Sequence, residues 1–234
     1  PPAPHPPRDS RRATPAEPPP LWSGGLFGDN VCPATPIAKD ETVMLRPDTL
    51  EADRAMLLLI DVQEKLLPMI LDRSRVVASS RLMAEGAALF DLPVLVTEQY
   101  PKGLGRTEAS ILAALSRTRF TLHEKPTFSA CGCESIREEI ARFDRPQVVL
   151  AGIEAHVCVQ QTALDLCVQD YDVFVCADGV GSRGTLSYDM ALHRMRQAGA
   201  KVTTVESVLF ELCHRCDALK FKAMLELIKA FPPA

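Results

Sequence analysis

The sequence has no uninterrupted apolar run long enough to span a lipid bilayer, so it does not predict a membrane-spanning helix. It also lacks an excess of positive charge, since 26 Lys and Arg stand against 30 Asp and Glu, a formal net charge of −4. A mildly acidic chain has no general electrostatic attraction to nucleic acids or to anionic membranes. No repeat period is visible either. We therefore expect no membrane partner, no nucleic-acid partner and no repeat architecture.

The eight cysteines are spread along 234 residues, of which 47% are hydrophobic. A chain of this length and composition can bury a core without disulfide bonds. We therefore expect reduced thiols and a cytoplasmic location. Arg8, Arg11 and Arg12 leave a mitochondrial location as the alternative. Asp9, Glu17 and the local density of proline argue against the amphipathic helix that a transit peptide forms.

Proline is concentrated at the start of the chain, where residues 1–38 hold eleven of the 19 prolines. Because proline lacks an amide donor and has a fixed φ, this stretch is unsuited to helices and central strands. Residues 1–53 are predicted to be a disordered or loosely wrapped N-terminal segment, and residues 54–234 to be the folded domain.

From about Arg54 onward, short apolar runs alternate with amphipathic stretches. This pattern predicts a doubly wound, mainly parallel sheet in a three-layer α/β/α sandwich. The predicted strands are 55–61, 93–97, 119–123, 147–151, 172–177 and 201–205, and the predicted helices are 73–90, 108–115, 134–143, 157–169, 185–197, 208–214 and 218–229. In such folds ligands bind beyond the carboxyl ends of the strands.

Three of these strand ends carry reactive side chains: Asp61, Lys125 and Cys158. Each has a plain structural alternative, namely a helix cap for Asp61, a solvated loop residue for Lys125 and a small buried apolar residue for Cys158. Taken together, they form a nucleophile with a base and a cation, the arrangement that covalent catalysis needs. The start of a helix would also favour the thiolate form of Cys158.

Other polar and aromatic residues lie beside these strand ends. Gln63 and Gln99 are candidate substrate contacts or hydrogen-bond partners within turns, and Phe128 is a candidate pocket wall or core residue. His156 is a candidate substrate contact or a histidine bonded within its turn. Asp178 is a candidate ligand contact or a cap of the next helix, 185–197, and we expect the cap. The glycine-containing turn before Cys158 could aim backbone amides at an oxyanion.

Two cysteine pairs, Cys131 with Cys133 and Cys213 with Cys216, suggest a structural zinc site as an alternative. The pairs lie far apart, and a chain of this size needs no metal to fold. We expect no metal and no cofactor.

Four segments, LLLIDVQEKL, VTEQYPKGLG, HEKPTFSA and GIEAHVCVQQTALDL, resemble the isochorismatase-like cysteine hydrolases, most closely the isochorismatase domain-containing subgroup. The resemblance covers residues 54–229. It implies a six-stranded sheet, a catalytic triad of Asp61, Lys125 and Cys158, and assembly into dimers or larger homo-oligomers. It also implies a cis peptide bond between Ile153 and Glu154, with the amides of Glu154 or Ala155 and of Cys158 forming an oxyanion hole.

Two departures from related enzymes narrow the function that the resemblance implies. Nicotinamidases of this superfamily bind a metal through an Asp and two His, whereas the stretch from Glu98 to Arg106 contains no His. Isochorismatases proper usually lack the nucleophilic cysteine that is present here as Cys158. We therefore expect a cysteine hydrolase that cleaves a small amide or related acyl substrate through a thioester. The alternatives are a non-catalytic binding or scaffold protein, a vinyl-ether hydrolase and a nucleic-acid-processing protein.

Overall fold

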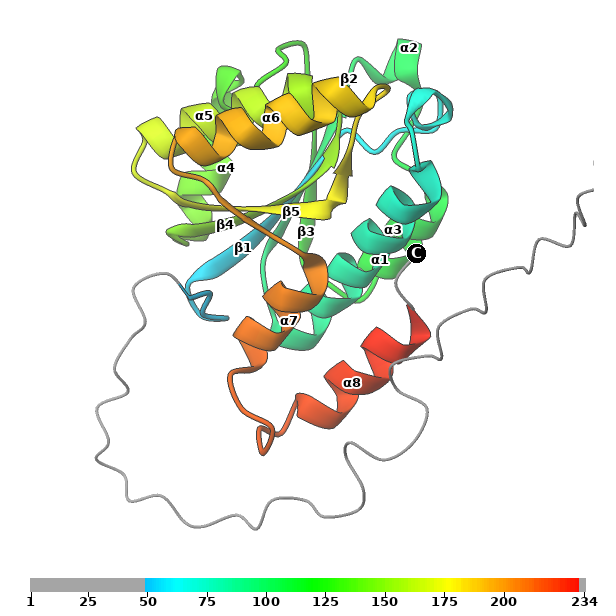
Figure 1. Ribbon diagram of the computed structural model, residues 1–234. Coiled ribbons are helices and arrows are strands. Elements are labelled where there is room, and N and C mark those ends of the chain that lie inside the picture. The colour runs from blue at the N-terminus through cyan, green and yellow to red at the C-terminus, as the bar shows by residue number, and fades with distance from the viewer. Residues whose placement is uncertain (1–48, 232–234) are drawn as a thin grey trace, which may run out of the picture. The chain divides into compact units, whose positions relative to one another are not determined.

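The structure is a computed structural model that describes residues 49–231. A sheet of six parallel strands lies between two groups of helices (Figure 1). This confirms the predicted doubly wound α/β/α sandwich. No helix within residues 49–231 has the length and apolar character to cross a membrane. Residues 1–48 of the predicted N-terminal segment lie outside the described residues.

The strands run in the order β3-β2-β1-β4-β5-β6, so the two central strands are β1 and β4. Every residue of these two strands is buried. The strands are β1 (Ala55–Ile60), β2 (Val94–Gln99), β3 (Phe120–Lys125), β4 (Gln147–Ile153), β5 (Asp172–Gly181) and β6 (Lys201–Thr203). The strand order reverses between β1 and β4, and the carboxyl ends of strands at such a switch point form a natural ligand crevice.

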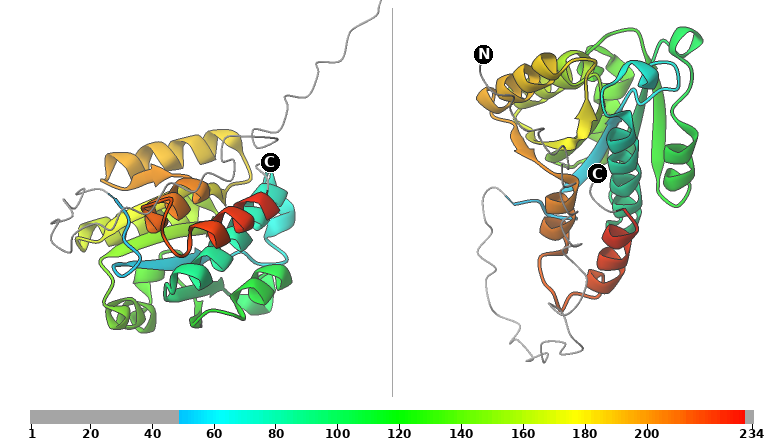
Figure 2. Two further views of the ribbon diagram at one scale, coloured as in Figure 1. Left: turned by 90° about the horizontal axis from the view of Figure 1, so that it is seen from below. Right: turned by 45° about the vertical axis from the view of Figure 1, so that its right-hand side comes forward.

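Alternate residues of β1 supply two separate cores. Leu57 and Leu59 belong to one core, and Met56 and Leu58 belong to the other. A group of helices covers each face of the sheet (Figures 1 and 2). The first group is α1 (Arg73–Phe90), α3 (Ala109–Leu115), α7 (Val205–Cys213) and α8 (Phe221–Ala230). The second group is α4 (Glu134–Phe143), α5 (Gln160–Val168) and α6 (Thr185–Gln197). Continuous apolar runs in the sequence therefore reflect a sheet covered on both faces.

Several elements begin or end away from their predicted bounds. The helix predicted from residue 157 starts as a π-helical turn, η3 (Ala155–Val159), before α5. A short helix, α2 (Pro101–Leu104), was not predicted. At the start of α7 (Val205–Cys213) the Thr204 side chain caps the helix, and the Val205 amide donates to the Asp178 carboxylate at 2.9 Å. Asp178 therefore bonds the start of α7, and the prediction that it caps the next helix, α6, is wrong, because the N-cap of α6 is Gly184.

The folded part begins before residue 54. Leu50 is fully buried in the core beside α7, and its amide donates to Glu211 Oε2 at 3.0 Å. The Glu51 amide donates to Gln147 Oε1 at 2.8 Å. Residues 49–53 therefore pack with the domain, whereas the sequence pattern assigns them to the N-terminal segment.

Candidate active site

A buried ion pair links the carboxyl ends of β1 and β3. Lys125 Nζ lies 2.7 Å from Asp61 Oδ2, and both side chains are fully excluded from solvent. Thr97 Oγ1, in β2, donates to the other carboxylate oxygen of Asp61 at 2.7 Å. An unpaired charge at this depth would be strongly destabilising. Asp61 is therefore held by partners on both oxygens and does not serve as a helix cap.

Three further acceptors fix the ammonium group of Lys125. They are Gln99 Oε1 at 2.8 Å and the backbone carbonyls of Thr127 and Phe128 at 3.1 and 3.0 Å. With Asp61, they are more acceptors than an ammonium group has protons. Lys125 is thus a buried, oriented cation and not a solvated loop residue.

Cys158 lies beside this pair. It belongs to η3 and is 5% exposed. The charges of Asp61 and Lys125 both act on the pKa of its thiol. The structure therefore brings together the three residues that the sequence places at separate strand ends.

The thiol of Cys158 is a weaker acid than its position at a helix start suggests. Burial and the charge of Asp61 raise its pKa, Lys125 lowers it, and the balance brings the pKa to about 12. At neutral pH the sulfur therefore carries its proton. Attack by this sulfur would require a base to remove the proton, and Asp61 is the neighbouring carboxylate whose charge acts on the thiol.

The turn before Cys158 is held by a second ion pair. The guanidinium of Arg183 donates to both carboxylate oxygens of Glu154, from Nε at 2.9 Å and from Nη2 at 2.6 Å. Arg183 lowers the pKa of Glu154, so the carboxylate is charged at neutral pH. The Ile153–Glu154 peptide bond is cis. Glu154 is 4% exposed, and Ala155 is fully buried behind it.

The two glutamines hold the site's framework. The Gln63 side chain donates to the carbonyls of Gln99 and Gly105 at 3.1 and 2.7 Å, and it accepts from the Gln99 amide at 2.8 Å. Because Gln63 is fully buried and its amide protons are both used, it ties the loop after β2 to β1 and does not face a ligand. Gln99 holds Lys125 and also donates to the Pro126 carbonyl at 3.1 Å.

His156 and Phe128 lie at the edge of the site. His156 Nδ1 is 3.0 Å from Ser182 Oγ, so this histidine is bonded to the loop after β5. Phe128 has 55% of its surface exposed and is not a core residue.

The predictions from the sequence do not include three residues that hold the site together: Thr97, Thr162 and Arg183. Thr162 Oγ1 donates to the Cys158 carbonyl at 2.7 Å and accepts from the Ala130 amide at 2.9 Å, which joins α5 to the loop after β3. Thr97 is the last residue of a predicted strand, and this position could have identified it as a site residue. Arg183 lies in the glycine-rich loop after β5, and nothing in that loop identifies Glu154 as its partner.

Replacing Thr97 by valine should lower the free energy of unfolding by about 1–3 kcal/mol, because one oxygen of the buried Asp61 loses its donor. Thr121→Val on β3 is the matched control, since Thr121 Oγ1 is buried without a hydrogen-bond partner. That variant should be neutral or more stable. Urea denaturation measures both, and equal stability of the two variants would contradict the role assigned to Thr97.

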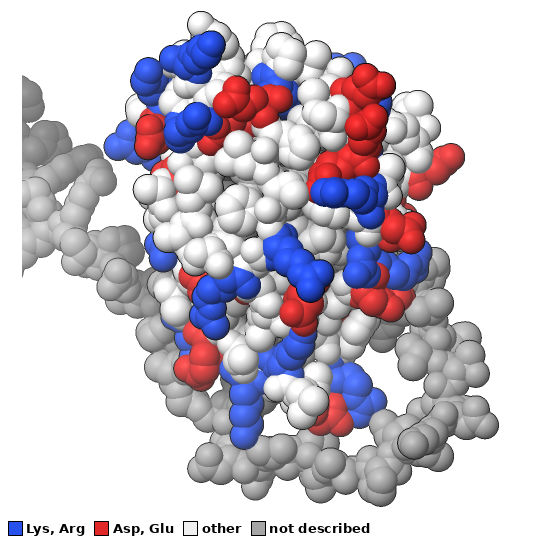
Figure 3. Space-filling model, turned by 180° about the vertical axis from the view of Figure 1, so that it is seen from behind, with Lys and Arg blue, Asp and Glu red and all other residues white. Residues whose placement is uncertain are grey.

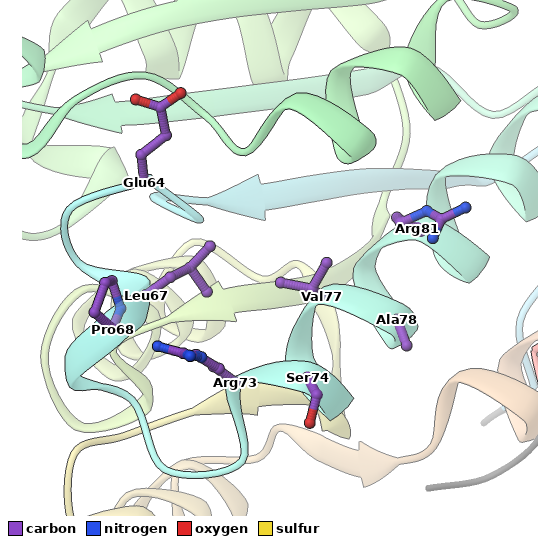
Figure 4. Close-up of a pocket in the computed structure, with 8 residues that line it drawn as sticks. All are labelled: Glu64, Leu67, Pro68, Arg73, Ser74, Val77, Ala78 and Arg81. Atoms are coloured by element: carbon purple, nitrogen blue, oxygen red, sulfur yellow. The ribbon is translucent and has the colours of Figure 1, made fainter.

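An open hollow of about 470 Å³ lies elsewhere, along the outer side of η1 (Leu67–Met69) and α1 (Figure 4). Leu67 and Val77 face each other across it, and its rim carries Glu64, Arg73 and Arg81. None of its lining residues belongs to the Asp61–Lys125–Cys158 cluster. In the described part of the chain, no group of three or more His, Cys, Asp or Glu side chains is placed to hold a metal ion.

Comparisons of sequence place this architecture among known proteins. The family model described as the isochorismatase domain matches residues 55–207. Isochorismatase domain-containing protein 2 of Xenopus laevis is 39% identical over 175 residues, which are 74% of this chain and 83% of that protein. Isochorismatase domain-containing protein 1 of Salmo salar is 38% identical over 176 residues, and the match spans only 60% of that protein.

Solved structures agree with this assignment. MAR1 ribonuclease from Caenorhabditis elegans is 34% identical with a TM-score of 0.74, and the match covers 79% of this chain and 94% of that one. The YcaC gene product from Escherichia coli, described as an octameric hydrolase of unknown specificity, is 25% identical with a TM-score of 0.73, with 79% and 91% covered. The chain therefore belongs to the isochorismatase family.

Proposed function

We propose that this protein is a cysteine hydrolase that cleaves small amides or related acyl compounds through a thioester, with Asp61, Lys125 and Cys158 as its catalytic residues. The observation that carries the proposal is the buried Lys125–Asp61 pair, 2.7 Å apart at the switch point of the sheet, whose charges act on the thiol of Cys158. A thiol beside an oriented base and cation is the arrangement of an activated nucleophile.

In the first half of the reaction, Asp61 takes the thiol proton as the sulfur of Cys158 attacks the amide carbonyl. Backbone amides of the turn from Glu154 to Cys158 donate to the developing oxyanion. The carbon–nitrogen bond then breaks, Asp61 gives its proton to the leaving amine, and a thioester remains on Cys158. Lys125 keeps Asp61 oriented and stabilises the sulfur while it carries negative charge.

In the second half, water attacks the thioester carbonyl. Asp61 takes a proton from this water, the carbon–sulfur bond breaks, and the sulfur recovers a proton from Asp61. The carboxylic acid leaves. The same carboxylate therefore acts as base and then as acid in each half of the reaction, which requires that it alternate between two protonation states during turnover.

Replacing Cys158 by alanine should lower kcat/KM on a true amide substrate by at least about 10³-fold, because the nucleophile is lost. Hydrolysis of a panel of small amides and the intact mass of the protein test this together. The wild type should show the mass of an acyl group on Cys158, and the variant should not. Cys167→Ala, a partly buried cysteine on α5, is the matched control and should keep full activity.

The same panel separates the alternatives. Full amide hydrolysis by Cys158→Ala would exclude the thioester. A vinyl-ether substrate that is cleaved equally well by Cys158→Ala would favour an isochorismatase-type reaction. If the wild type turns over no amide or vinyl ether and forms no adduct, a binding or scaffold role is the better account.

A second candidate function, RNA cleavage, comes from the name of the C. elegans relative. The charge of this chain does not favour it, since the formal net charge is −4 and basic and acidic side chains are intermixed over the face shown in Figure 3. A polyanion gains most from a continuous basic surface. We propose a small-molecule substrate and no nucleic-acid partner, and RNA belongs in the substrate panel as a negative control.

We also propose that the protein assembles into a homo-oligomer, a dimer or larger. The E. coli relative described as octameric supports this. The C-terminal helix, whose apolar sequence suggests an interface, is largely occupied within the chain, because Met224 and Ile228 of α8 are buried in the core with α1.

A further inference from the structure

The charged side chains of the candidate site already neutralise one another. Asp61 pairs with Lys125 at 2.7 Å, and Glu154 pairs with Arg183 at 2.6 Å. Both oxygens of each carboxylate accept hydrogen bonds. A charged substituent on a substrate would therefore meet two compensated ion pairs, and binding it would mean opening one of them or desolvating the substituent without a counter-ion.

Two aromatic side chains, by contrast, are exposed to solvent at residues whose backbone is hydrogen-bonded to Lys125. Phe128 is 55% exposed, while its carbonyl accepts from Lys125 Nζ at 3.0 Å. Tyr100 is 62% exposed, and its amide donates to the Lys125 carbonyl at 3.4 Å. The Tyr100 ring packs directly over Gly103, where a Cβ atom would lie 2.3 Å from the ring. Both rings are thus attached to backbone that contacts Lys125.

Two more exposed apolar side chains follow the ends of β1 and β5. Leu71 is 51% exposed, and its amide donates at 3.0 Å to the carbonyl of Ser182, the residue that bonds His156. Leu186 is 73% exposed and lies in the first turn of α6, a helix that packs against η3. Single exposed apolar residues are ordinary, but these four all follow carboxyl ends of strands, the edge of the sheet at which Asp61, Lys125 and Cys158 lie. Apolar side chains at this edge suit the apolar groups of a ligand.

We propose that Leu71, Tyr100, Phe128 and Leu186, here called the apolar rim, select the substrate. They favour neutral amides that carry an aromatic or branched alkyl group and disfavour amides that carry a charged group. This inference rests on the proposed function, because it assigns the substrate class of the same site.

Three alkylating agents with the same reacting carbon test this without knowledge of the natural substrate: iodoacetate, iodoacetamide and N-benzyl-iodoacetamide. In each reaction the thiol proton of Cys158 is lost to solvent, the thiolate sulfur forms a bond to carbon, the carbon–iodine bond breaks, and iodide leaves. Peptide mass spectrometry gives the rate at Cys158, and each rate is divided by that of N-acetylcysteine. The benzyl compound should react fastest and iodoacetate slowest, with at least about a tenfold difference between them.

Side-chain variants locate this preference. Phe128→Ala and Tyr100→Ala should each reduce the benzyl preference by about fivefold or more. Phe120→Ala is the matched control, because Phe120 is also exposed, at 37%, but lies at the opposite end of β3. It should leave all three normalised rates unchanged. Thermal unfolding confirms that each variant is folded, and the order of the three reagents on the wild type is a test that needs no variant.

The outcomes are distinguishable. Equal normalised rates, or a faster reaction with iodoacetate, would overturn the inference and leave the thioester mechanism intact. A benzyl preference that survives both rim variants would also overturn it. If none of the three reagents modifies Cys158 while exposed Cys216 is labelled, the nucleophile is inaccessible, and the proposed function fails together with the inference.

Discussion

Replacing Asp61 by asparagine should slow amide hydrolysis by about 10²–10⁴-fold and yet speed the alkylation of Cys158 by iodoacetamide. Hydrolysis requires a group that removes a proton from sulfur and then gives one to the leaving amine. Alkylation requires only the thiolate. The two reactions therefore report separately on proton transfer and on thiol acidity at the same sulfur.

The sign of the alkylation effect follows from the pKa of Cys158. Burial and the charge of Asp61 raise this pKa to about 12, and Lys125 opposes them. Asparagine removes one of the two raising effects and leaves Lys125 in place, so the pKa falls. For each unit of the fall, the thiolate fraction at pH 8 rises about tenfold. The wild-type alkylation rate should still be climbing at pH 10.5, whereas the variant should level off at a lower pH.

The measurement is a pH–rate profile of alkylation at Cys158 beside kcat/KM on one amide. Asp189→Asn, which alters an exposed aspartate of α6, is the matched control and should change neither rate. Slower alkylation in Asp61→Asn would mean that Asp61 assists the thiolate and does not oppose it. Unchanged hydrolysis would remove Asp61 from the mechanism.

The sequence predicts the fold well because the pattern of apolar residues that indicates a strand or a helix recurs in each element. The strands β1 and β4 are apolar at successive positions, and this is the pattern of a sheet covered on both faces. The positions of Asp61 and Cys158 just beyond such strands are visible in the same pattern. Parallel strands that share one sheet then bring these carboxyl ends together, whatever the lengths of the connections between them.

The remaining features depend on distances through space that no local pattern contains. A helix start suggests a more acidic thiol at Cys158, whereas the depth of burial, which only the tertiary structure determines, raises its pKa. Gln63 reads as a free polar side chain until its partners, 36 and 42 residues away, are known. The Glu154–Arg183 pair spans 29 residues and joins two different loops.

Replacing Gly152 by alanine should be the most destabilising small change in this domain. Gly152 pairs with Ile60 across the two central strands, its φ is +129°, and a Cβ atom there would lie 2.1 Å from the Ile60 carbonyl oxygen. The left-handed backbone and the overlap with main-chain atoms should together lower the free energy of unfolding by about 2–6 kcal/mol. The backbone cannot move aside easily, because both strands are held in the middle of the sheet by neighbours on either side. A shift there would also displace Asp61, which follows β1, and the turn to Cys158, which follows β4.

Two other glycines separate these two causes. Gly199 also has a positive φ, of +104°, but has open space where a Cβ atom would lie, so Gly199→Ala measures backbone strain alone. Gly184 has open space and an ordinary φ of −147°, so Gly184→Ala should be close to neutral. Urea denaturation should rank the losses as Gly152, then Gly199, then Gly184. If Gly152→Ala is no worse than Gly199→Ala, the strands β1 and β4 do not approach so closely at the site. The positioning of Asp61 against Cys158 would then need another explanation.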